Sequence, residues 1–129
     1  MEKNVLVDSS FFIGCLRHRQ DPFAMLAEAD EGWEFYTCGI VVLEVCRGIK
    51  LESAMRKYRE VFQVMPCVPI TSHVWEMASD LAWKLDRNGN TMQATDLLIA
   101  ASALTVDAAI LTLDADFNRV PGLSVLNSI

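Results

Sequence analysis

TDLLIAASALTVDAAILTLDADF, residues 95–117, is the part of the sequence that says most about the fold. Seven of the eight residues at 97–104 are apolar, which predicts a helix at about 95–105 that is buried on most of its surface. AAILTL at 108–113 predicts a buried strand, and the two acids of DAD follow it directly. A buried helix that leads into a buried strand is typical of a parallel sheet covered by helices.

The rest of the chain shows the same alternation of short apolar strands and helices. Asp21-Pro22 is a good helix start, and Gly48 interrupts the helical pattern at 40–65. Strands are predicted at 4–7, 33–37, 67–70, 108–113 and 123–127, and helices at 9–19, 22–31, 40–65, 72–87 and 95–105.

Two of these helices carry predictions about individual residues. Ser72 is expected to cap the helix at 72–87. The residues expected to face the core from that helix are Val74, Ala78, Leu81 and Leu85. In the second half of 40–65, a spacing of three to four residues predicts an apolar stripe made of Leu51, Met55, Tyr58 and Phe62.

The composition indicates one folded domain in a reducing compartment. The 129 residues are 52% hydrophobic, which is enough for one sizeable core, so residues 1–129 are predicted to form a single domain. No apolar run is long enough to cross a bilayer, and the first ten residues show no secretory signal. The four cysteines lack C-x-x-C pairing, which disfavours a zinc site or a disulfide framework. We therefore expect a cytoplasmic protein with reduced thiols and no membrane contact.

The net charge of −6 counts against simple binding to nucleic acid, because phosphates attract an excess of Lys and Arg. A local cluster of basic residues, or a bound metal ion, could still supply positive charge. The positions of the acids therefore matter more than their total number.

Five acids are predicted to meet at the carboxyl edge of the sheet, which is where open α/β folds bind ligands. Asp8 and Asp114 directly follow predicted strands, and Asp116 comes two residues after Asp114. Asp96 starts the helix that leads back to the last of these strands, and Glu44 lies early in another helix. Each acid alone has a simpler explanation as a loop, turn, helix-end or solvent-exposed residue. Their shared placement favours a common site.

Four segments, in this order, resemble the PIN-domain nucleases, and most closely the small VapC-type toxins of bacteria and archaea. They are VDSS at 7–10, LEVCRG at 43–48, TDLLIAASA at 95–103 and LTLDADF at 111–117. Each segment is a weak signal alone, but their order and spacing are fairly specific and cover essentially the whole chain. The resemblance implies an α/β fold, a PIN-like three-layer α/β/α sandwich with a short, mostly parallel central sheet flanked by helices.

The resemblance also assigns roles to residues of this sequence. The catalytic acids that it implies are Asp8, Glu44, Asp96 and Asp114, and the metal ligands are Asp8, Asp96, Asp114 and Asp116. The supporting hydroxyl groups are those of Ser9, Ser10 and Thr112. For an RNA substrate, the candidate phosphate contacts are Arg17, Arg19, Arg47 and Lys50.

A set of carboxylates suits the binding of divalent metal ions that hydrolyse phosphodiesters. Mg²⁺ and Mn²⁺ prefer carboxylate and water oxygens, so His18 and His73 need not be ligands. Hydrolysis of a phosphodiester needs a nucleophilic water, charge neutralisation and a stabilised leaving oxygen, and bound metal ions can supply all three. The resemblance implies a metal-dependent endoribonuclease that acts on RNA, as the toxin of a VapBC-type toxin–antitoxin pair. It also implies a small VapB-like antitoxin as partner, and a homodimer.

Three alternatives remain open at this point. The chain could be a PIN-domain nuclease of RNA processing that is not a toxin, or a non-catalytic module of the same fold that holds a basic partner. The third is a Mg²⁺-dependent phosphatase in which Asp8 is the nucleophile. That chemistry usually needs a second acid two residues later, where this sequence has Ser10, and a lysine near Asp96 or Asp114, where it has none.

Overall fold

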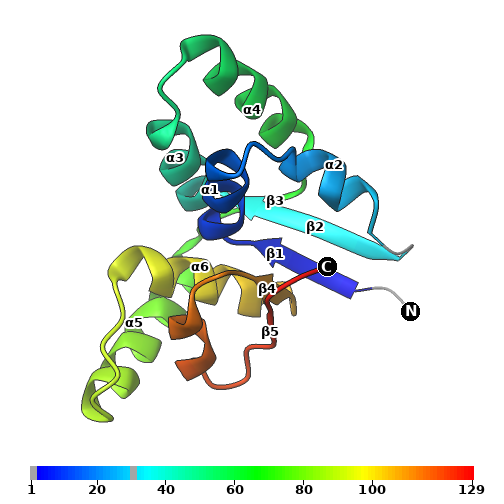
Figure 1. Ribbon diagram of the computed structural model, residues 1–129. Helices are drawn as coiled ribbons and strands as arrows, with labels where there is room; N and C mark the ends of the chain where they lie inside the picture. The colour runs from blue at the N-terminus through cyan, green and yellow to red at the C-terminus, as the bar shows by residue number, and fades with distance from the viewer. Residues whose placement is uncertain (1–2, 30–31) are drawn as a thin grey trace.

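The computed structural model describes residues 3–29 and 32–129, and a five-stranded sheet lies at its centre (Figure 1). The strands are β1 (Lys3–Val7), β2 (Trp33–Cys38), β3 (Cys67–Val68), β4 (Ala109–Leu111) and β5 (Val125–Leu126). Their order across the sheet is β3-β2-β1-β4-β5, and the four strand pairs of the described residues are all parallel.

Six α-helices of the described residues surround this sheet. They are α1 (Ser9–Arg17), α2 (Pro22–Ala27), α3 (Gly39–Gly48), α4 (Glu52–Val64), α5 (Ser72–Arg87) and α6 (Ala94–Thr105), and a short 3₁₀ helix, η1 (Ala115–Arg119), follows β4. In the view of Figure 1, α1 to α4 lie above the sheet, and α5 and α6 lie below it. The predicted α/β/α sandwich around a parallel sheet is therefore confirmed.

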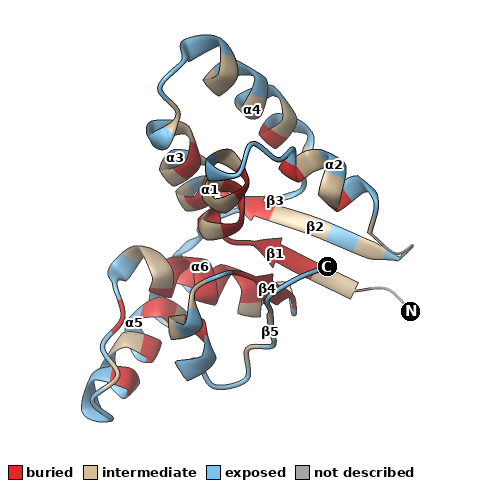
Figure 2. Ribbon diagram, viewed as in Figure 1, coloured by how far each residue is buried: buried red, intermediate tan, exposed pale blue. Residues whose placement is uncertain are grey.

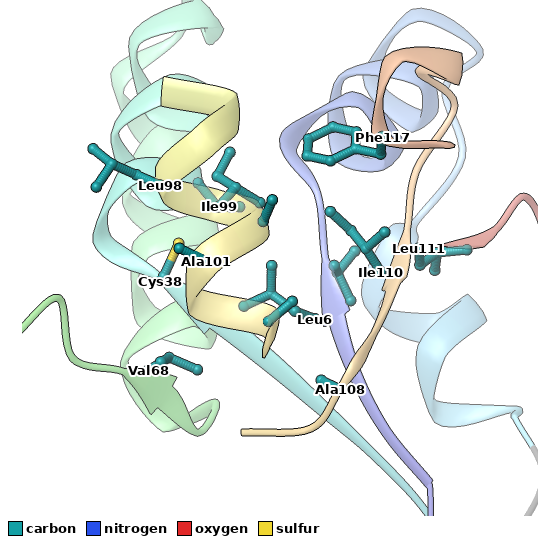
Figure 3. Close-up of a cluster of buried hydrophobic side chains, with 14 of the residues drawn as sticks. Leu6, Cys38, Val68, Leu98, Ile99, Ala101, Ala108, Ile110, Leu111 and Phe117 are labelled. Carbon is teal, nitrogen blue, oxygen red and sulfur yellow. The ribbon is translucent and has the colours of Figure 1, made fainter. Parts of the chain in front are cut away.

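The core is concentrated along β1, β4 and α6 (Figure 2). Val5, Leu6 and Val7 have no exposed surface, and every residue of α6 from 97 to 103 is buried. Figure 3 shows side chains of α6, β1 and β4 packed together in this core. Strands covered on both faces must be apolar throughout, which is why the runs at 4–7 and 108–113 predicted buried strands. The first prediction is confirmed, and the second is correct except that the strand covers only Ala109–Leu111.

The strand order changes direction between β1 and β4. From β1 the chain builds β2 and β3 on one side, whereas β4 and β5 lie on the other. The carboxyl end of such a switch point is the usual ligand site of an open α/β sheet. The register pairs Val7 with Leu111, so the next residues, Asp8 and Thr112, leave the sheet side by side.

Several helix ends differ from the sequence predictions. α2 begins as expected, because the Asp21 side chain accepts hydrogen bonds from the N–H groups of Phe23 and Ala24, but it ends at Ala27. The predicted end at 30–31 lies outside the described residues. The predicted helix at 9–19 ends at Arg17.

The prediction that Ser72 caps α5 is wrong. Thr71 is the capping residue, and its Oγ1 accepts a hydrogen bond from the Val74 N–H at 3.4 Å. The buried face of α5 is as predicted and consists of Val74, Ala78, Leu81 and Leu85.

The apolar stripe predicted for α4 is correct only toward its carboxyl end. Phe62 is buried, and its ring packs against those of Phe12 and Phe23 at centroid distances of 5.1 and 5.6 Å. Leu51 precedes the helix with an extended backbone and is 70% exposed. Helical spacing does not apply to a residue outside the helix, so Leu51 does not continue the stripe.

Two further features concern the cysteines and the length of the helices. All four cysteines are free thiols. Among the residues that the structure describes, no helix combines the length and the apolar character needed to cross a membrane.

Thr37→Val is expected to leave the free energy of unfolding unchanged or to raise it by about 1 kcal/mol. Thr37 is fully buried at the end of β2, and its Oγ1 has no hydrogen-bond partner within residues 3–29 and 32–129. Valine has nearly the same shape and removes the unpaired hydroxyl. Urea denaturation measures the change, and a loss above 1 kcal/mol would show that Oγ1 does have a partner.

Candidate active site

A hollow of about 470 Å³ lies at the carboxyl end of β1 and β4, and we call it the acidic hollow. Three of its lining carboxylates come from separate parts of the chain: Asp8 after β1, Asp96 in α6 and Asp114 after β4. The other lining residues are Ser9, Ser10, Ile13, Gly14, Arg17, Leu113 and Ala115. In Figure 1, α6 begins on the side toward which β1 and β2 point, which brings its first turn to this edge.

Asp8 is buried, with 3% of its surface exposed, and hydroxyl groups surround its carboxylate. Its Oδ2 accepts a hydrogen bond from Ser10 Oγ at 2.7 Å and another from Thr112 Oγ1 at 2.8 Å. Burying a carboxylate without partners is costly, so these two donors are what make its position stable.

Backbone amides fix the direction of both hydrogen bonds. The Leu113 N–H donates to Ser10 Oγ at 2.9 Å, and the Asp114 N–H donates to Thr112 Oγ1 at 2.9 Å. Since an amide can only donate, each hydroxyl accepts from it and directs its own single proton to Asp8. The 3.1 Å contact between the two hydroxyl oxygens therefore takes neither proton. Two chains of hydrogen bonds, each from a backbone amide through a hydroxyl group to the carboxylate, therefore end at Oδ2, and we call them the relays. Oδ1 remains the oxygen of Asp8 that can accept further bonds.

Ser9 lies between Glu44 and Asp8, with its hydroxyl oxygen near both carboxylates. Ser9 Oγ donates to Glu44 Oε1 at 3.1 Å, whereas its distance to Asp8 Oδ1 is 3.5 Å. The shorter distance identifies Glu44 as the acceptor of the single Ser9 proton. Glu44 thus belongs to the same cluster, although it does not line the acidic hollow.

Asp114 and Asp116 have different surroundings. Asp114 lines the acidic hollow, and its Oδ1 also accepts a hydrogen bond from the Asp116 N–H at 2.9 Å, which caps η1. The Asp116 side chain forms a half-exposed ion pair with Arg119 at 3.5 Å. Asp114 is therefore the acid of this segment that faces the acidic hollow. It can cap η1 and line the hollow at the same time.

The charges of the cluster act together on Asp96. Burial raises the pKa of Asp96 to about 6, together with the charges of Asp8, Asp114, Glu44 and Asp116, in that order of effect. Asp96 is the third residue of α6, in a first turn whose N–H groups favour a negative side chain. Burial and the four neighbouring carboxylates outweigh that effect. The structure thus brings acids from four segments of the chain to one place.

The basic residues considered as phosphate contacts are separated in the structure. Of Arg17, Arg19, Arg47 and Lys50, only Arg17 lines the acidic hollow. Arg19 follows the end of α1 with φ of 53° and lines a different hollow. Arg47 and Lys50 are exposed near the end of α3, outside the acidic hollow.

Gly14 and Leu113 line the acidic hollow but were not predicted from the sequence. A Cβ atom at Gly14 would lie 2.9 Å from Leu113 Cδ1, so the leucine side chain rests on the backbone of α1. A glycine inside a predicted helix is a signal of close packing. The sequence gives that signal but does not reveal which side chain approaches.

The donor set of the acidic hollow fits a divalent cation by its chemistry, because carboxylate oxygens are the ligands that Mg²⁺ and Mn²⁺ prefer. The spacing is looser than in a formed site. Within the described ranges, no three Asp, Glu, His or Cys side chains are close enough together to hold an ion without moving. Mutual repulsion of like charges favours this separation, and a cation would have to draw the side chains together.

Thr112→Val is expected to lower the free energy of unfolding by about 1.5–3 kcal/mol. The substitution removes one of the two donors to Asp8 Oδ2 and the acceptor of the Asp114 N–H. Thr37→Val is the matched control, because it makes the same change at another fully buried threonine and removes no hydrogen bond of the described residues. Urea denaturation in EDTA compares them, and equal effects of the two substitutions would contradict the relay.

The sequence matches one family model over most of its length. The model of the PIN domain matches residues 5–123. No curated protein matches the sequence significantly.

Several solved structures share the fold at low sequence identity. DNA-bound VapBC from Salmonella typhimurium has a TM-score of 0.81 and 16% identity, with 98% of each chain covered. VapBC2 from Rickettsia felis, bound to a DNA fragment from its promoter, has a TM-score of 0.80 and 18% identity, with 95% of this chain and 97% of that chain covered. VapC20 from Mycobacterium tuberculosis, a toxin that cleaves the sarcin–ricin loop, has a TM-score of 0.65 and 18% identity, with 88% and 92% covered. Because the family model spans nearly the whole sequence and the fold agrees with it, this chain belongs to the PIN-domain family.

Proposed function

We propose that this protein is a metal-dependent endoribonuclease that hydrolyses RNA phosphodiester bonds, and that it is the toxin of a VapBC-type toxin–antitoxin pair. The observation that carries the proposal is the convergence of Asp8, Glu44, Asp96 and Asp114 from four segments. Burial of Asp96, together with the charges of the neighbouring acids, raises its pKa to about 6. A fold gains no stability from placing like charges together, so such a cluster is best explained by a function. The match to the PIN domain over residues 5–123 also supports one PIN-like domain across residues 1–129.

Asp8, Asp96 and Asp114 are the residues that would hold Mg²⁺ or Mn²⁺, because their carboxylates line the acidic hollow. When bound, such ions supply charge neutralisation at phosphorus and lower the pKa of a water molecule. Ser10 and Thr112 fix Asp8, so that its Oδ1 is presented while its Oδ2 stays engaged. Ser9 holds Glu44 beside the same carboxylate.

Arg17 is the basic residue best placed to contact a phosphate. It lines the same hollow as the three carboxylates, so its guanidinium group can bind a non-bridging phosphate oxygen at the entrance. RNA as substrate is supported by the similarity to VapC20, which is described as cleaving the sarcin–ricin loop. The net charge of −6 is consistent with this substrate once cations offset the cluster.

The proposed partner is a small VapB-like antitoxin, and the proposed assembly contains a homodimer of this chain. Support for the antitoxin comes from the structural neighbours, several of which are VapBC or toxin–antitoxin complexes. A short reading frame next to the gene, whose product binds this chain, is the expected finding.

The proposal predicts that RNA cleavage requires Mg²⁺ or Mn²⁺ and stops in EDTA. The test incubates the purified chain with total RNA and with p-nitrophenyl phosphate, with each metal and with EDTA. RNA cleavage with either metal and no hydrolysis of p-nitrophenyl phosphate is the expected result. Cleavage that persists in EDTA contradicts the metal requirement. Absence of any turnover, with RNA or a basic peptide bound, favours a non-catalytic binding module.

A further inference from the structure

A second hollow, of about 210 Å³, lies directly beside the acidic hollow. We call it the neutral hollow. It is lined by residues of α1, by Gln20 and Met25, and by residues 127–129. Gly14 and Leu113 line both hollows, so the Leu113 side chain forms the boundary between them. A ligand that crosses Leu113 therefore passes from one hollow into the other.

The neutral hollow differs chemically from the acidic hollow. None of the described residues that line it is Asp, Glu, Lys or Arg. Phe11, Cys15 and Met25 give it apolar walls, and burial raises the pKa of the Cys15 thiol, which therefore stays uncharged at neutral pH. His18 and Asn127 are exposed polar groups among its lining residues.

We propose that the neutral hollow binds a nucleobase of the RNA strand whose phosphodiester lies in the acidic hollow. The inference rests on the proposed function. A nucleotide combines an anionic phosphate with a flat, uncharged base, and the two adjoining hollows match this division. Bases of single-stranded RNA can turn out of the stack, where proteins bind them through aromatic or apolar walls and polar groups at their edges.

The end of α1 shows the same separation of a charged group from an uncharged site. Arg17, the last residue of this helix, lines the acidic hollow, and His18, the next residue, lines the neutral hollow. A cation for the phosphate and a polar ring for the base edge thus stand next to each other in the sequence.

Size and charge favour a base over other occupants. A second phosphate would be bound best by Lys or Arg, and neither lines the neutral hollow among the described residues. The volume of about 210 Å³ is below the range of about 300–1,000 Å³ for drug-sized ligands, so it suits one ring system rather than a length of peptide.

The test fills the neutral hollow and measures recognition of the base. Ser128→Trp places a ring there from an exposed position, and Ser124→Trp is the matched control because Ser124 is exposed and lines neither hollow. Wild type and both variants cleave a short RNA pool randomised at every position, in Mg²⁺, and the cut sites are sequenced. The best-cut RNA is then made with an abasic residue at each position near the cut in turn, and kcat/KM is measured.

In the wild type, one abasic position is expected to lower kcat/KM by about 10-fold. Ser128→Trp is expected to lower kcat/KM on the intact RNA by about 10-fold and to lose this sensitivity, whereas Ser124→Trp behaves as wild type. His18→Ala, an exposed change, is expected to alter the order of preferred sequences and serves as a second variant if Ser128→Trp misfolds.

Two results would overturn the base site alone: equal sensitivity to abasic residues in wild type and Ser128→Trp, or equal losses in the two tryptophan variants. Unchanged cleavage of the intact RNA by Ser128→Trp would likewise overturn the base site. If the wild type cleaves none of the RNA pool, the proposed function fails, and the base site fails with it.

Discussion

Asp8→Asn is expected to lower RNA cleavage by more than about 100-fold while the protein stays folded. The asparagine carbonyl oxygen can take the place of Oδ2 and accept the hydrogen bonds of Ser10 and Thr112 at 2.7 and 2.8 Å. The amide NH₂ group then stands where Oδ1 was, and an NH₂ group donates hydrogen bonds but cannot bind a cation. The cleavage rate in Mg²⁺ and a urea denaturation curve measure the two parts of the prediction.

Asp86→Asn is the matched control for this substitution. Asp86 is exposed on α5 and does not line the acidic hollow, so the same loss of one carboxylate there is expected to leave the rate unchanged. A wild-type rate in Asp8→Asn would remove Asp8 from the proposed site. An equal loss in both variants would show that the overall charge, and not the position of Asp8, controls cleavage.

The parts of the fold that the sequence predicted well are those in which burial leaves little choice. The run at 4–7 and the helix at 95–105 are apolar on nearly all sides, and both lie in the middle of the core. The choice between Thr71 and Ser72 as cap of α5 was different, because both residues have a hydroxyl group. The extended backbone at Thr71, with ψ of 174°, decides it, and the sequence does not contain that angle.

Helix ends also limited what the sequence could say about basic residues. In a helix over 9–19, Arg17 and Arg19 would lie on nearly opposite sides, because residues two apart on a helix do not face each other. The helix ends at Arg17, and the positive φ of Arg19 turns the chain away, so the two arginines line different hollows. Which of them can meet a phosphate thus depends on a local backbone conformation.

For the acids, the sequence predicted their common edge but not how they are held. Asp8 and Asp114 follow strands that turned out to be neighbours, and the parallel register sets Asp8 beside Thr112. The relays depend on the amides of residues 113 and 114, whose direction is fixed only when the chain turns after β4. The roles of these residues in catalysis remain predictions, and Asp8→Asn tests the role of Asp8.

Asp96→Asn is expected to make the metal-free protein more stable at neutral pH. The pKa of Asp96 is about 6 in the folded protein, against about 4 in an unfolded chain, so the folded state binds this proton more tightly. In EDTA, stability from this group is therefore present below pH 4 and is lost as the pH rises through 6. Because Asp96 is partly exposed, solvent screening limits the loss at pH 7.5 to about 1–2 kcal/mol. Asparagine carries no charge and avoids that loss, and urea denaturation at pH 4 and pH 7.5 measures the difference between the two proteins.

Addition of Mg²⁺ is expected to reverse this order of stability at pH 7.5. A cation that binds only the folded state at 100 times its Kd stabilises it by about 2.7 kcal/mol, and the wild type has the complete set of carboxylates to gain this energy. Asp96→Asn lacks one of the carboxylates that line the acidic hollow and should gain clearly less. Equal stabilisation of both proteins by Mg²⁺ would place the cation elsewhere. If Asp96→Asn is no more stable than wild type in EDTA at pH 7.5, then burial and the four neighbouring carboxylates do not destabilise the charged form of Asp96. Asp96→Asn is thus expected to be more stable than wild type without metal and less stable with it. A carboxylate placed only to start a helix would not give this combined result, because its removal would destabilise α6 under both conditions.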